Sequence, residues 1–85
     1  MSFVITKPLI DTLRGDVEQG RDSAIQAVLT DLHPADIAAV LDRLNLDDAV
    51  YVYRLLESEE SADVLLELHE ELREELLNSL TSREI

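Results

Sequence analysis

Nine carboxylates crowd one stretch of this chain, and they are the side chains whose type and spacing suit them to chemistry. They are Glu57, Glu59, Glu60, Asp63, Glu67, Glu70, Glu71, Glu74 and Glu75. Arg73 is the only lysine or arginine among them. Pairs such as Glu67–Glu71 and Glu71–Glu75 place like charges four residues apart, which costs a helix about 0.2–0.5 kcal/mol per pair. A cation or a basic partner would remove that repulsion.

Carboxylate oxygens select hard cations, and Mg²⁺ in particular binds through one or two carboxylates while it keeps several waters. A calcium loop of the EF-hand type is not indicated, because Asp47-Asp48 is followed by apolar residues without a glycine. These nine carboxylates, the acidic tract, therefore predict a weak Mg²⁺ site shared across an interface. Its candidate metal ligands are Glu59, Glu60 and Glu67, and the adjoining acidic patch comprises Glu70, Glu71, Glu74 and Glu75.

A simpler interpretation of the same acids stays open. Glu59, Glu60 and the pair Glu70-Glu71 fall in the first turns of expected helices, where acidic side chains are stabilised by the helix dipole. The other acids would then form only a solvated face.

The remaining reactive side chains do not form a catalytic set. His33 and His69 stand at helix starts, where a histidine is usually a capping or surface residue. The serines have no suitable base near them, and the two glycines are isolated, so neither a nucleophile nor a phosphate-binding loop is indicated. We therefore expect no enzyme. Tyr53 falls on an apolar stripe, whereas Tyr51 points elsewhere and is a candidate for partner contact.

Helices must position these carboxylates. In the segment 32–44, Pro34 suits the first helical position, and Ile37, Val40, Leu41 and Leu44 form one apolar stripe. The stripe recurs at shifts of twelve residues. The shifted sets are Ile25, Val28, Leu29 and Leu32; Ala49, Val52, Tyr53 and Leu56; Val64, Leu65 and Leu68; and Leu76, Leu77 and Leu80.

This pattern predicts an all-α fold, a right-handed superhelix (solenoid) of short helices with a repeat of approximately 12 residues. Helices of about nine residues are unstable in isolation and must pack against neighbouring helices. A four-helix bundle is the alternative, although it favours longer helices. Asp22, Ser58 and either Asn45 or Asp47 are the expected side-chain caps of successive helices.

The length of 85 residues indicates a single domain, 1–85. Residues 1–20 are expected to form an N-terminal cap helix that begins at Pro8 and ends at Gly20, and residues 21–85 to form the repeats. We expect the chain to be a truncated fragment, because the family pattern described below continues with a further acidic motif that this sequence lacks.

The formal net charge of −12 at pH 7 disfavours binding to nucleic acid or to an anionic membrane. No apolar run is long enough to enter a bilayer, so we expect no direct membrane insertion by this segment. The chain has no cysteine, which excludes disulfides and fits a cytosolic setting. Regularly spaced hydrophobic residues, 46% of the sequence, argue against disorder.

The run Leu32-His33-Pro34-Ala35-Asp36-Ile37-Ala38, together with Ser61-Ala62-Asp63-Val64-Leu65, resembles the cytosolic N-terminal domain of MgtE-type magnesium transporters. The resemblance implies a superhelix of short helices on the cytoplasmic side of the inner membrane. It also implies CBS domains and a transmembrane part of the same transporter as partners, in a homodimer.

In that family Mg²⁺ bridges acidic residues of the domain and its neighbours and holds the pore closed. The acidic position of the family motif falls on Asp63, which the resemblance thus makes the best Mg²⁺ contact. Two other functions stay open. One is a helical scaffold module similar to the flagellar motor switch protein FliG, with no metal role, and the other is an acidic protein that mimics nucleic acid.

Overall fold

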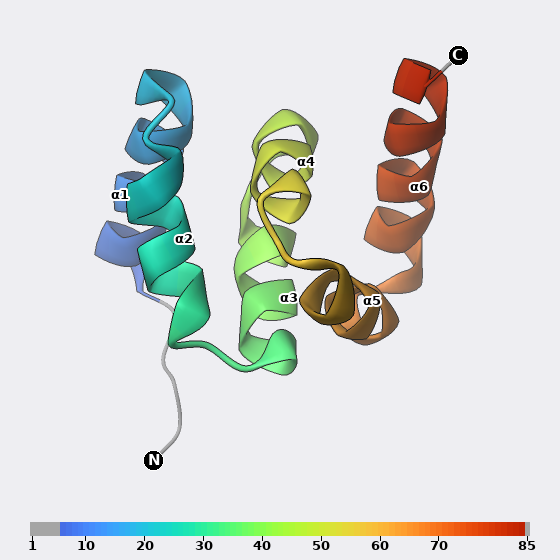
Figure 1. Ribbon diagram of the computed structural model, residues 1–85, viewed down its shortest axis with the longest axis horizontal. Helices are drawn as coiled ribbons and strands as arrows, with labels where there is room; N and C mark the ends of the chain where they lie inside the picture. The colour runs from blue at the N-terminus through green and yellow to red at the C-terminus, as the bar shows by residue number, and fades with distance from the viewer. Residues whose placement is uncertain (1–5, 85) are drawn as a thin grey trace.

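The computed structural model describes residues 6–84, with side chains as far as residue 80 (Figure 1). Within these residues the chain forms six α-helices and no strand, which confirms the all-α prediction. The helices are α1 (Lys7–Gln19), α2 (Asp22–Thr30), α3 (Pro34–Arg43), α4 (Leu46–Arg54), α5 (Ser58–Glu67) and α6 (Glu70–Glu84).

Helices α2 to α6 begin at Asp22, Pro34, Leu46, Ser58 and Glu70, so that each start follows the previous one by twelve residues. The helices α2 to α5 have nine or ten residues, and α6 has 15. Six short helices contradict the alternative of a four-helix bundle. The superhelical winding, its right hand and a repeated packing unit stay predictions.

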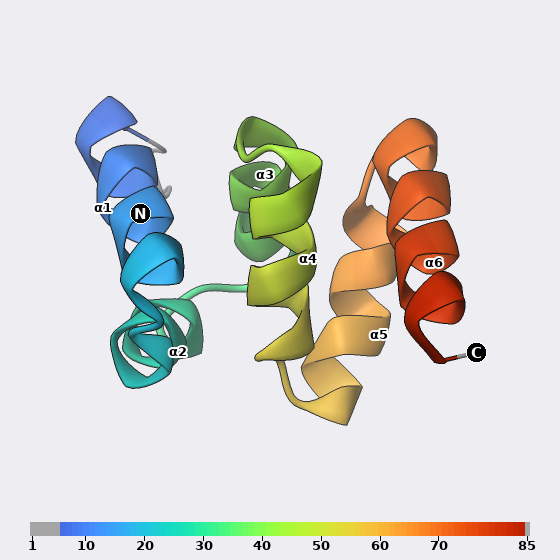
Figure 2. The ribbon, with the colours of Figure 1, turned by 90° about the horizontal axis from the view of Figure 1, so that it is seen from above.

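Helices α1 and α2 pack on each other as a first pair, and α3 and α4 as a second pair (Figures 1 and 2). Helix α5 packs on α3, and α6 packs on α4, so both rest on the second pair. The first pair joins the others through α1, which contacts α4. Within the described residues, α3 with α5 and α4 with α6 are thus the two contacts between helices two places apart in the chain that build the C-terminal half of the fold.

Every helix contributes at least one fully buried side chain to the core. The largest of these side chains are Leu13, Ile25, Ile37, Val40, Leu41, Val52, Val64 and Leu76. The predicted stripe of α3 is buried at all four positions, because α3 lies between its partner and α5. The stripe predicted for α6 is wrong at Leu77, which is 44% exposed while its neighbour Leu76 is fully buried.

The helix ends follow from local chemistry. The side chain of Asn45 accepts a hydrogen bond of 2.8 Å from the backbone N–H of Asp48 and caps α4, one of the two residues expected there. Asp22 and Ser58 do not cap their helices, because each is the first helical residue; the residues before them make no side-chain cap. Gly20 ends α1 with φ of 70°, a left-handed conformation that favours glycine.

Candidate functional site

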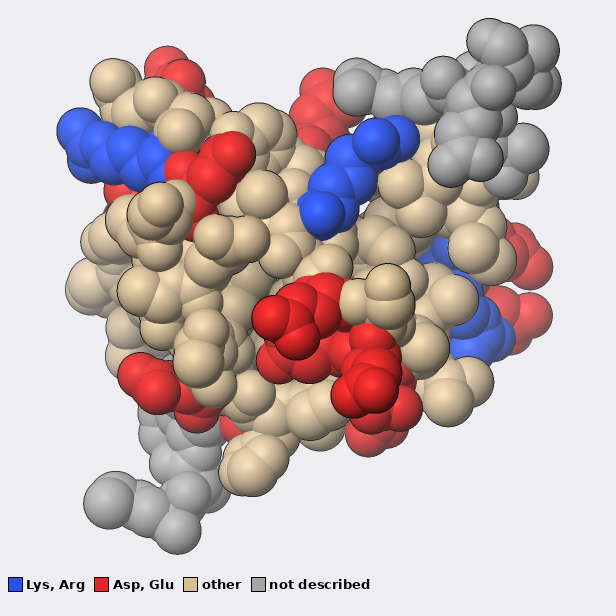
Figure 3. Space-filling model, viewed as in Figure 1, with Lys and Arg blue, Asp and Glu red and all other residues tan. Residues whose placement is uncertain are grey.

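The acidic tract lies on α5 and on the first turns of α6. Val64 and Leu68 are buried where α5 packs on α3, and this packing fixes the rotation of α5 about its axis. Residues 59, 63 and 66 follow at intervals of four and three, so they share the opposite face of the helix. Glu59 and Asp63 are accordingly exposed. In Figure 3, acidic side chains gather on the part of the surface where α5 lies in Figure 1.

The first turn of α5 is held to α4. The Tyr53 hydroxyl donates a hydrogen bond of 3.0 Å to the carbonyl oxygen of Ser61, and the Ser61 hydroxyl donates one of 2.9 Å to the carbonyl oxygen of Ser58. Glu59 and Glu60 lie in this turn, where the helix dipole favours their negative charge. The turn therefore presents its carboxylates from a fixed backbone.

The structure brings two of the candidate ligands together. Asp63 and Glu67, one helical turn apart, both line a shallow hollow of about 370 Å³ between the end of α5 and the start of α3. Within the described residues, neither carboxylate has an ion-pair partner. These two side chains are therefore free to accept a ligand from outside the chain.

The other candidates lie apart from this pair. Glu60 is half-buried and lines a different hollow, of about 210 Å³, with Gln26 and Thr30 of α2. Glu67 follows Glu60 by seven positions, which is about 10 Å along the helix axis. Glu59 is exposed, and the acidic patch of Glu70, Glu71, Glu74 and Glu75 is exposed along α6. Of the eight predicted site residues, the structure therefore brings only Asp63 and Glu67 together at one hollow.

Sequence reasoning missed one polar contact next to the acidic tract. His69, which immediately precedes α6, lies with Nε2 3.4 Å from Oδ2 of Asp42 in α3. No local spacing signals this pair, because the two residues are distant in the sequence and meet only through the packing of α3 and α5.

Among the described residues, no three histidine, aspartate or glutamate side chains are arranged to hold a metal ion together. Asp63 and Glu67 nevertheless suit Mg²⁺ as a pair of oxygen donors that open to solvent, because this ion binds through one or two carboxylates and retains waters. Further ligands would come from water or from an adjoining surface.

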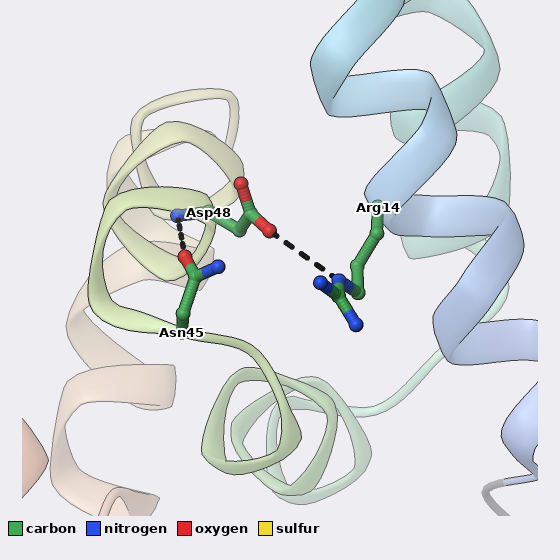
Figure 4. A network of polar contacts seen from close by, with 3 residues as sticks. All are labelled: Arg14, Asn45 and Asp48. Atoms are coloured by element: carbon green, nitrogen blue, oxygen red, sulfur yellow. Dashed lines mark hydrogen bonds and ion pairs between the residues drawn. The ribbon is translucent and has the colours of Figure 1, made fainter.

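A larger hollow, of about 650 Å³, lies between α1, α4 and α6. At one side of it the Nε atom of Arg14 in α1 lies 3.9 Å from Oδ2 of Asp48, the residue whose N–H is bound by the Asn45 cap (Figure 4). Tyr51 also lines this hollow, and its hydroxyl donates a hydrogen bond to Asp22. Tyr51, expected as a partner contact, thus makes a contact within the chain.

Residues 32–85 match the family model of the MgtE intracellular N domain. The chain belongs to this family. The match begins two residues before α3 and includes both Asp63 and Glu67, whereas α1 and α2 precede it. No curated protein and no solved structure matches the chain. No helix of this N domain within residues 6–84 is long and apolar enough to cross a membrane.

Proposed function

We propose that this N domain is the magnesium-sensing regulatory domain of a magnesium transporter, on the cytoplasmic side of the inner membrane. Its family membership supports a role in such a transporter and favours it over a flagellar scaffold. The partners are the CBS domains and the transmembrane part of the same transporter, within a homodimer. Mg²⁺ bridges the acidic face of α5, at Asp63 and Glu67, to these neighbours and thereby closes the pore.

The observation that carries this proposal is the pair Asp63 and Glu67, exposed, one turn apart and without an ion-pair partner in the described part of the chain. A chain of net charge −12 repels an acidic neighbour. A divalent ion between the two surfaces removes that repulsion, so rising Mg²⁺ shifts the population from undocked to docked domains. One or two carboxylates bind Mg²⁺ only weakly, which keeps the contact reversible.

A magnesium titration of the 85-residue chain tests the proposal. The double variant D63N/E67Q removes two charges from the candidate pair, and E74Q/E75Q removes two charges from the exposed face of α6 as a matched control. At constant ionic strength, we expect Mg²⁺ to shift the amide resonances of residues 63 and 67 in the wild type and in the control. The D63N/E67Q variant should lose these shifts.

The same two double variants are then tested in the full-length transporter. There, D63N/E67Q should weaken closure by Mg²⁺, measured as ion flux across a range of Mg²⁺ concentrations, while E74Q/E75Q should retain it. Equal loss in both variants would mean that total charge, and not this pair, carries the response. Normal closure in D63N/E67Q would refute the assignment of these residues.

A further inference from the structure

Leu66 is the most exposed large hydrophobic side chain in the described part of the chain. It is 75% exposed, whereas Leu68, two residues later on the same helix, is 5% exposed. The difference follows from helix geometry, because Leu68 lies on the face that packs on α3 and Leu66 on the opposite side. Packing within the chain therefore does not account for a leucine at this position.

Leu66 does not stand alone. It lines the hollow of about 370 Å³ together with Pro34 and Ala35 of α3, so that three apolar side chains from two helices line the same hollow. Pro34 is fixed at this place because it is the first residue of α3, and α3 packs against α5. The hollow thus has an apolar floor that is built by tertiary packing.

The rim of this hollow is negatively charged. Asp63 and Glu67 flank Leu66 in the sequence, and both line the hollow. The other charged or titratable side chain that lines it is His33, and no lysine or arginine does. An apolar floor with two carboxylates one turn apart complements an apolar side chain with cationic neighbours at the same spacing.

We propose that this hollow docks a basic amphipathic helix of a partner protein. A leucine-sized side chain of the helix packs against Leu66, Pro34 and Ala35, and lysine or arginine residues on either side of it pair with Asp63 and Glu67. The docking needs no metal ion. The proposal is argued from the residues of the hollow, so it does not depend on whether the N domain senses Mg²⁺. Since Mg²⁺ and the basic helix use the same two carboxylates, they compete.

The apolar contact is tested with a synthetic amphipathic helix of leucine, alanine and lysine, labelled with fluorescein and titrated with the 85-residue chain in EDTA. We expect saturable binding that L66A weakens about tenfold, the effect of losing most of one buried leucine contact. L77A, which truncates the exposed leucine of α6, should change affinity by less than about twofold. Alanine preserves helix propensity at position 66, and circular dichroism checks the fold.

The polar contact is tested with D63N/E67Q and, as control, E74Q/E75Q, and by adding MgCl₂ at matched ionic strength. D63N/E67Q should weaken binding more than the control, and Mg²⁺ should release the peptide from the wild type. Binding that is not saturable, equal loss in both double variants, or no loss in L66A would overturn the proposal. So would sedimentation that shows a dimer of the chain abolished by L66A, because a second copy would then occupy the hollow.

Discussion

The hydroxyl of Tyr51 in α4 donates a hydrogen bond to the carboxylate of Asp22 in α2, across 29 residues of sequence. A second hydrogen bond joins α2 to the end of α4. The Gln26 side-chain amide of α2 donates to the carbonyl oxygen of Leu55, at 3.3 Å. Together these bonds tie α2, which precedes the region matched by the family, to a helix inside that region. The first helix pair is thus fixed to the second by polar contacts as well as by the packing of α1 on α4.

The Tyr51 contact predicts a pH effect. The hydrogen bond to Asp22, then partial burial, then the negative charge of Asp22 raise the pKa of the Tyr51 phenol above 10.0. The neutral phenol is therefore favoured in the folded state. Its contribution to stability is complete below pH 10.0 and is lost as the pH rises through the folded-state pKa.

This effect is measured by titrating the tyrosinate absorbance of a Y53F variant, in which Tyr51 is the only tyrosine. We expect its midpoint above 10.0 and a return toward that value when D22N is added. A midpoint at or below 10.0 in the Y53F background would show that the Asp22 contact does not form in solution.

The Asn45 cap predicts a difference between two helix starts. N45A removes the acceptor of the Asp48 N–H and should lower the free energy of unfolding by about 1 kcal/mol. Glu57 occupies the same position before α5 but makes no side-chain cap, so E57A should cost less. Urea unfolding of both variants compares the two costs, and an equal cost would argue against the Asn45 bond.

The two glycines should respond to alanine with opposite signs. Gly20 has φ of 70°, where an L side chain is strained, so G20A should destabilise the fold by about 1–2 kcal/mol. Gly15 lies inside α1 with open space where a Cβ would be, so G15A should stabilise it by about 0.5–1 kcal/mol. Thermal unfolding of the two variants tests this prediction. A melting temperature that shifts in the same direction in both would contradict the backbone conformations of Gly15 and Gly20.

Alanine substitution of two neighbouring leucines in α6 should lower the free energy of unfolding by unequal amounts. Leu76 is fully buried and Leu77 is 44% exposed. L76A should cost about 2–5 kcal/mol, because it removes buried apolar surface and leaves a cavity. L77A should cost less than about 1 kcal/mol. Similar losses in urea unfolding would mean that α6 does not pack on α4 as it does here.

The helices were predictable because their information is local. Apolar residues at helical spacing, Pro34 at a first helical position and Asn45 as a cap all act within one or two turns. The caps assigned to Asp22 and Ser58 were wrong by one residue, because short polar side chains suit both a cap and a first turn. Contacts such as His69 with Asp42 depend on packing between helices, which no local spacing records.

The candidate site was predictable in its residue types and less so in its grouping. The exposure of the Asp63 side chain follows from its position next to the buried Val64 on the same helix. The division between Glu60 and Glu67 does not, because it depends on which helix ends near each of them, α2 at one end of α5 and α3 at the other. The exposed Leu66 gave no signal, since a leucine in an amphipathic helix is ordinarily expected inside.

The short links between the helices restrict how this chain can change in length. Between α2 and α6 each link has two or three residues, so adjoining helices have little spare chain to absorb an insertion. One residue added near the start of α4 would rotate the later side chains of that helix by about 100° about its axis and carry residues such as Val52 out of the core. Single-residue insertions and deletions within α3, α4 or α5 should therefore strongly destabilise the fold, because they misalign the buried face of a helix that has little spare chain on either side.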